Sequence, residues 1–243
     1  MAAPDSAQSH RVSQNQEQEV AGSNPAERTS WILIDVPSRS DEHPRSWPNV
    51  ALSAGGLLMV PMWVRYTSLH GPTSFDEDGH WLGQGPGFWG SMMAPAMLLI
   101  VLGVYGQRAL LVGRSRRIAR LGYWLTVIGL GVPAVLDLSV REVVPPFLMP
   151  LAALGLILLA AAHRHDPALP IACRVALFAM GILLSAAFLM NAIPLETLDT
   201  FQWYRLYGIQ SNVLFGLGWV IFGASLARSS AAELTPSRAT EAA

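Results

Sequence analysis

The sequence predicts an all-α membrane protein, a bundle of six transmembrane helices preceded by a disordered N-terminal tail. Of its 243 residues, 51% are hydrophobic and only 14% are charged, which is more apolar than a typical soluble domain. Six apolar stretches have about the 20 residues that a helix needs to cross the hydrocarbon core. Between two of them lies Arg108–Arg120, with five arginines and no acidic residue. Such segments collect on the cytoplasmic side of membranes.

The chain begins with a polar segment, residues 1–46, that is rich in Ser, Gln, Glu, Asn and Pro. It has no long apolar run, so it buries too little surface to offset the entropy lost on folding. It also lacks the apolar core of a signal peptide near Met1. We therefore expect a disordered cytoplasmic tail at 1–46, a six-helix transmembrane domain at 47–228 and a short cytoplasmic C-terminal tail at 229–243.

The six apolar stretches define the expected helices. They cover residues 48–66, 88–107, 121–140, 146–163, 174–193 and 208–227. Small residues recur within them at four-residue spacing, Ala51 with Gly55 and Gly181 with Ser185. Small side chains let two membrane helices approach closely, so these pairs predict helix–helix contacts.

The distribution of arginine predicts the orientation of the chain. If Arg108–Arg120 is cytoplasmic, alternation of the six helices leaves only Arg65, Arg141 and Arg205 outside. The other arginines then lie inside, as the positive-inside rule requires. All sixteen basic residues are arginine, which is typical of GC-rich bacterial coding. We therefore expect a multi-pass protein of the bacterial cytoplasmic membrane with both termini in the cytoplasm.

Short motifs occur along the chain in a characteristic order. They are Gly87-Phe88-Trp89 at the second helix, Gly113-Arg114 in the arginine segment, and Tyr207-Gly208-Ile209-Gln210 followed by Trp219 and Arg228 in the sixth helix. Over roughly residues 48–228 this order resembles a family of bacterial six-helix integral membrane proteins of unknown function. The chain departs from the family at the end of the third helix. It has Asp137-Leu138-Ser139 there, where the family has an acidic residue followed by proline. The resemblance implies the six-helix architecture and no particular chemistry.

Several function classes are excluded by residues that the sequence lacks. It contains no lysine, so a Schiff-base or Walker-type lysine cannot exist, and the single Cys173 excludes an internal disulfide and a thiolate cluster. No H-E-x-x-H, G-x-S-x-G or C-x-x-C motif occurs. We expect no cofactor. A net charge of −1 without a broad basic face argues against nucleic-acid binding.

The longest outer loop, residues 67–87, contains Asp76, Asp78 and His80. Carboxylates and imidazoles are ligands for divalent ions, but this spacing matches no established ligand motif. We interpret the segment as a solvated acidic loop and predict no metal site.

Polar residues within the predicted helices gather toward their outer ends. Five of them fall in the outer third of four helices, namely Ser91, Asp137, Asn191, Ser211 and Asn212. At 1.5 Å per residue, Asp137 lies about 24 Å along its helix from Leu121, close to the outer interface. Pro133 removes a backbone donor four residues earlier and predicts a kink that could open a cavity.

The last outer loop places further acidic and aromatic residues near these outer helix ends. It contains Glu196 and Asp199, which share a face if the loop is helical. It also contains the aromatic residues Trp203, Tyr204 and Tyr207, which suit the headgroup zone. An aromatic belt is the ordinary interpretation. The more specific interpretation is a binding pocket. Its lining residues would be Arg65, Asn191, Trp203, Tyr204, Arg205, Tyr207 and Asn212.

Three functions remain open from the sequence. The first, placed slightly ahead, is binding or transport of a small amphipathic molecule through an outward-facing polar pocket. The second is a membrane-embedded enzyme that uses Asp137 and Glu196 as acid and base on a lipid-soluble substrate, with carboxyl pKa values raised by partial burial. The third is a non-catalytic accessory subunit that binds a membrane protein partner. In each case the bilayer itself is an expected partner.

Overall fold

The computed structural model describes residues 46–69, 86–113, 117–141, 147–192 and 205–241. Every regular element in these ranges is a helix, which confirms the all-α prediction. The elements are α2 (Trp47–Leu69), α3 (Pro86–Ser91), α4 (Met93–Gly106), α5 (Arg108–Val112), α6 (Arg117–Val140), α7 (Met149–Ala162), α8 (Ile171–Ala192), the π-helix η1 (Ile209–Leu214) and α10 (Phe215–Glu241). The predicted tail at 1–46 falls almost wholly outside the described residues.

Four stretches of these helices are long and apolar enough to cross a membrane. They are Phe88–Gly106, Arg117–Val140, Ile171–Met190 and Arg205–Ala231. Helix α7 is apolar but shorter, and α2 carries Pro61 and Arg65 in its second half. Large apolar side chains also cover the outside of the helices, among them Leu57, Leu102, Ile128, Val175 and Ile221. These features indicate a membrane protein.

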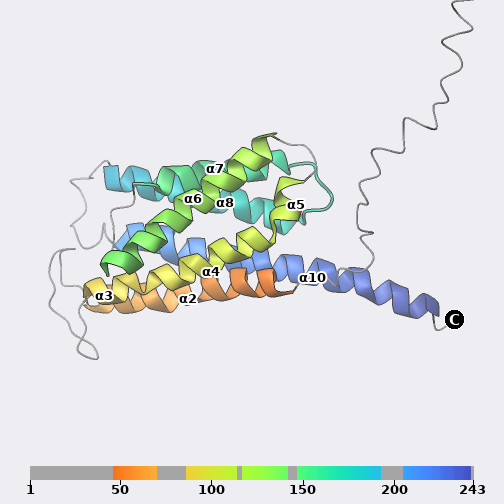
Figure 1. Ribbon diagram of the computed structural model, residues 1–243, viewed down its shortest axis with the longest axis horizontal. Helices are drawn as coiled ribbons and strands as arrows, with labels where there is room; N and C mark the ends of the chain where they lie inside the picture. The colour runs from red at the N-terminus through yellow and green to blue at the C-terminus, as the bar shows by residue number, and fades with distance from the viewer. Residues whose placement is uncertain (1–45, 70–85, 114–116, 142–146, 193–204, 242–243) are drawn as a thin grey trace, which may run out of the picture. The chain divides into compact units, whose positions relative to one another are not determined.

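The long helices lie side by side (Figure 1), and their contacts close into a ring. Each of α2, α4, α6, α7 and α8 packs against the next in chain order, and α10 returns to pack against α2. Neighbours run in opposite directions. For example, Leu52 of α2 meets Gly103 of α4, whereas Gly55, one turn later in α2, meets Ala96, which is earlier in α4.

This alternation gives the bundle two ends. The Asp137 end holds the last turns of α2, α6 and α8, together with α3 and η1. The arginine end holds the first turns of α2, α6 and α8, together with α5.

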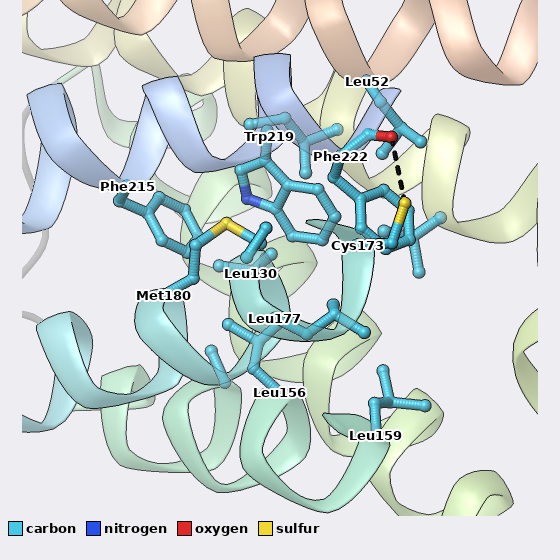
Figure 2. Packing of buried hydrophobic residues seen from close by; sticks show 14 of the residues in the cluster. Leu52, Leu130, Leu156, Leu159, Cys173, Leu177, Met180, Phe215, Trp219 and Phe222 are labelled. Atoms are coloured by element: carbon cyan, nitrogen blue, oxygen red, sulfur yellow. Dashed lines mark hydrogen bonds between the residues drawn. The ribbon is translucent and has the colours of Figure 1, made fainter. Parts of the chain in front are cut away.

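The middle of the ring is filled by apolar side chains from all six long helices. One from each helix is at most 3% exposed, namely Leu52, Ile100, Leu130, Leu156, Leu177 and Trp219. Trp219 lies centrally, with Phe215 and Phe222 edge-on at 5.9 and 5.7 Å between ring centroids. Figure 2 shows Met180 and Leu130 beside it. Such close contact stabilises a bundle through dispersion, because lipid supplies little hydrophobic drive between helices.

Glycines let the backbones of neighbouring helices touch. Two consecutive glycines in α2 face two partners: Gly55 lies against Ala96 of α4, and Gly56 lies against the backbone of Gly216 in α10. Gly181 of α8 lies against Ala153 and Ile157 of α7. The predicted close contacts at Gly55 and Gly181 are therefore confirmed.

One close contact between α6 and α7 is at Gly155. A Cβ there would lie 2.5 Å from Thr126 Oγ1 and 2.6 Å from Thr126 N, and the Thr126 hydroxyl already donates a hydrogen bond to Gly122 O at 2.9 Å. Neither neighbour can move without disturbing α6. A Cβ at Gly131 of α6, by contrast, would meet nothing nearer than Val101 at 3.7 Å.

Gly155→Ala should therefore destabilise the protein by about 2 kcal/mol, the usual cost of overpacking a filled core. Gly131→Ala, the matched control, should be neutral or stabilise by up to about 1 kcal/mol, because alanine favours the helix. Thermal unfolding of both variants in mild detergent measures the difference. Equal stability of the two variants would contradict the close α6–α7 contact.

Candidate functional site

The structure describes part of the predicted pocket. Among the predicted site residues, Arg65, Asp137, Arg205, Tyr207 and Asn212 are described, and all five lie at the Asp137 end. Glu196, Trp203 and Tyr204 lie outside the described residues, as do Asp76, Asp78 and His80 of the outer loop. Asn191 is in the last turn of α8, but its side chain is not described. The predicted pairing of Asp137 with Glu196 is therefore untested.

Asp137 is more buried than its interfacial position suggested. It lies one turn before the end of α6, and only 7% of it is exposed. Pro133 is part of α6, which is continuous from Arg117 to Val140. The short helix α3 packs against this end of the ring, where it contacts α2, α4 and α6. The sequence did not predict α3 as a separate helix, because residues 88–107 were interpreted as one helix.

Ser91 is placed at this end by a break between α3 and α4. Pro95 has no N–H for the Ser91 carbonyl and its ring crowds that carbonyl, so the helix is interrupted four residues earlier. The Ser91 hydroxyl donates to Phe88 O at 2.8 Å, and the residue is fully buried.

The π-helix η1 supplies the third buried polar residue. Ser211 is 5% exposed, and its hydroxyl donates to Tyr207 O at 2.9 Å while accepting a hydrogen bond from Asn212 Nδ2 at 3.0 Å. Gly208, just before η1, packs directly against the Trp63 ring of α2. Single π-helical turns store strain and occur frequently at functional sites.

Together these elements form a polar layer at the Asp137 end, defined here as Ser91, Asp137, Ser211 and Gln210. The first three are buried and come from α3, α6 and η1. The Oε1 atom of Gln210 is also buried and accepts no hydrogen bond within the described part of the chain. A buried acceptor without a donor is costly, so a ligand N–H or O–H at this position would be stabilised. Gln210 was named in the sequence only as part of a motif.

At the arginine end several polar groups bond to one another, whereas the Tyr123 hydroxyl and Arg174 Nε are buried without a hydrogen-bond partner among the described residues. Gln107 Nε2 donates to Asn49 Oδ1 at 2.6 Å and so links α4 to α2. His163 is 3% exposed, with Nε2 2.8 Å from Leu111 O and Nδ1 3.0 Å from Asp166 Oδ2. Both ring nitrogens thus face acceptors, and a ring that carries both protons donates to each.

His163 therefore has a structural role that the sequence did not reveal. It ties α5 to the connection between α7 and α8, whereas His165 is exposed. The partner carbonyl at Leu111 is 52 residues away, so no local pattern could have indicated the contact.

The chemistry open to the polar layer follows from its groups. Asp137 is the single carboxylate at this end among the residues described, and no cluster of three metal-ligating side chains occurs in the described ranges. The layer offers one acid, two hydroxyl groups and an amide. This set suits hydrogen bonding to the polar part of a ligand.

Comparison with known proteins adds no further identification. The chain matches no family model, no curated protein and no solved structure. Its resemblance to a family of six-helix membrane proteins therefore stays a prediction.

Replacing His163 with Phe should destabilise the protein by about 1–3 kcal/mol, because it removes two hydrogen bonds and leaves the Leu111 carbonyl without its donor. His165→Phe, two residues away on an exposed position, is the control and should change stability by less than about 0.5 kcal/mol. Thermal unfolding of both variants in the same detergent measures the effect. Similar losses in the two variants would mean that His163 does not link α5 to the α7–α8 connection.

Proposed function

We propose that this chain crosses the bacterial cytoplasmic membrane six times, with the Asp137 end outside and both termini in the cytoplasm. The closed ring supports this count. Because α6 finishes at the Asp137 end and α8 begins at the arginine end, α7 must carry the chain back across. With 14 residues, α7 is only about 21 Å long, so its flanking residues and local thinning of the bilayer complete the crossing.

Within this topology, we propose that the polar layer binds the polar part of a small amphipathic molecule that enters from the outside. The observation that carries this proposal is that three buried polar residues, Ser91, Asp137 and Ser211, come from separate elements at one end of a largely apolar bundle. Polar groups in a membrane interior are costly and usually functional. The unmatched Gln210 oxygen adds an acceptor for the ligand.

The packing favours binding over transport. Beneath the polar layer, the described helices fill the middle of the ring with Trp219 and its apolar neighbours. Passage of a solute would require these contacts to separate. A receptor or binding protein needs no such change, and it is the function that this geometry supports best.

The two alternatives rank lower. The enzyme alternative needs Asp137 to act with a second group such as Glu196, whose position relative to Asp137 is not described. The accessory-subunit alternative explains the apolar exterior but not the buried polar layer. Both make different predictions in the experiment below.

Asp137→Asn should reduce the amount of bound small molecule at least about tenfold, since it removes a charge-assisted hydrogen bond without changing shape. The measurement is native mass spectrometry of the full chain extracted from its own membrane in mild detergent. Ser139→Ala, an exposed hydroxyl two residues away, is the control and should retain the molecule.

Four outcomes would overturn this proposal. A wild-type chain with no retained small molecule, or equal retention in the two variants, would contradict ligand binding by Asp137. A retained protein partner without a small molecule would instead favour the accessory subunit. A catalysed conversion that is lost with Asp137→Asn would favour the enzyme.

The six-crossing topology has its own test. In a Cys173→Ala background, Phe147→Cys at the Asp137 end should react with an impermeant maleimide added to intact cells. His165→Cys at the arginine end should react only after the cells are opened. Both original side chains are exposed. Labelling of both positions from the same side would contradict the crossing by α7.

A further inference from the structure

We propose that α5 and the first two turns of α6 bind the headgroup of an anionic phospholipid whose acyl chain lies along the exposed face of α6. The site consists of Arg108, Arg117, Arg120 and Trp124. It rests on α6 crossing the bilayer, as proposed above, and does not depend on the ligand at the Asp137 end.

The first observation is a positive cluster without counter-ions. Arg108, Arg117 and Arg120 are all exposed, and none forms an ion pair in the described part of the chain. The sequence from 79 to 136 contains no acidic residue at all. The nearest described carboxylate at this end, Asp166, is already engaged by His163. Within the described residues no carboxylate pairs with these three arginines, so they can bind an anionic headgroup.

The second observation is that one member of the cluster, Arg108, lies over an aromatic ring of α6. The guanidinium carbon of Arg108 lies 5.9 Å from the centroid of Trp124, within the range of a cation–π interaction. Arg120 is one turn before Trp124, and Arg117 is three residues before Arg120, so all lie on neighbouring positions of one helix face. Tryptophan at this depth is typical of the headgroup zone.

The third observation is an apolar track that continues from the cluster. The same face of α6 presents Leu121, Trp124, Ile128, Val132 and Val135, each at least 41% exposed. An acyl chain can lie along this face while its phosphate reaches the arginines, whose planar guanidinium groups bind phosphate oxygens in pairs. The positive charge at one end of an apolar track matches an anionic phospholipid better than a soluble anion.

The test is a lipid titration of the full-length protein, delipidated in mild detergent and followed by native mass spectrometry. Dioleoylphosphatidylglycerol should bind at least about tenfold more tightly than dioleoylphosphatidylcholine, which has the same chains and no net charge. The triple variant Arg108→Gln, Arg117→Gln, Arg120→Gln should lose this preference. Arg228→Gln, which removes another exposed arginine on α10, should keep it.

Further variants separate charge from packing. Trp124→Ala should weaken phosphatidylglycerol binding severalfold, whereas Trp124→Phe should retain most of it because the ring face remains. A triple Arg→Lys variant, which keeps the charge if the Gln variant fails to fold, should preserve at least part of the preference.

The proposal is overturned if wild-type protein binds the two lipids equally, or if the triple Gln variant keeps the preference. It is also overturned if millimolar inorganic phosphate displaces phosphatidylglycerol completely, because the site would then be a simple anion site. None of these outcomes bears on the ligand proposed at the Asp137 end. Failure of the cysteine-labelling experiment, by contrast, would contradict the crossing by α7 and with it the six-crossing topology.

Discussion

Direct contact between helix backbones, permitted by glycine, is the constraint on which the rest of this structure depends. In a bilayer, dispersion and hydrogen bonds must hold helices together, so small gaps at an interface are costly. Gly56 and Gly216 bring α10 against α2 and so close the ring. The same contact sets the register that places Gly208 against Trp63. The position of η1, and with it the polar layer, therefore follows from the closure of the bundle.

The two ends of the ring use polar groups in different ways. At the arginine end, Gln107 bonds to Asn49, and His163 bonds to both Leu111 and Asp166. These pairs join separate elements and stabilise one arrangement. At the Asp137 end, the Ser91 and Ser211 hydroxyls donate to carbonyls three or four residues earlier in their own segments, and Ser211 Oγ also accepts from its neighbour Asn212. Such local bonds leave the hydroxyl oxygens able to accept from a ligand, so this end is the better place for a binding site.

The sequence predicted the helices well and the site only in part. Apolar length located α6 and α8 within a few residues, since 121–140 and 174–193 compare with Arg117–Val140 and Ile171–Ala192. Asp137 was predicted as a site residue because a carboxylate in an apolar segment is conspicuous, and the structure places it buried in the last turn of α6. The π-helical turn was not predicted, because its hydrogen-bond pattern depends on tertiary packing and not on side-chain periodicity. His163 and Leu111 are 52 positions apart in the sequence, and Gln107 and Asn49 are 58 positions apart. Contacts over such separations have no local sequence signal either.

The arginines at the arginine end connect the proposed topology with the proposed lipid binding. A positive loop is retained inside because moving its charges across the membrane is costly, and that argument requires only that the charges be present. Their arrangement requires a separate reason. Arg108 comes from α5, folds back over Trp124 of α6 and leaves Arg117 and Arg120 exposed beside it. A retention signal alone would be satisfied by arginines placed anywhere in the loop. The cluster at the end of an apolar track is therefore better explained by a bound anionic headgroup.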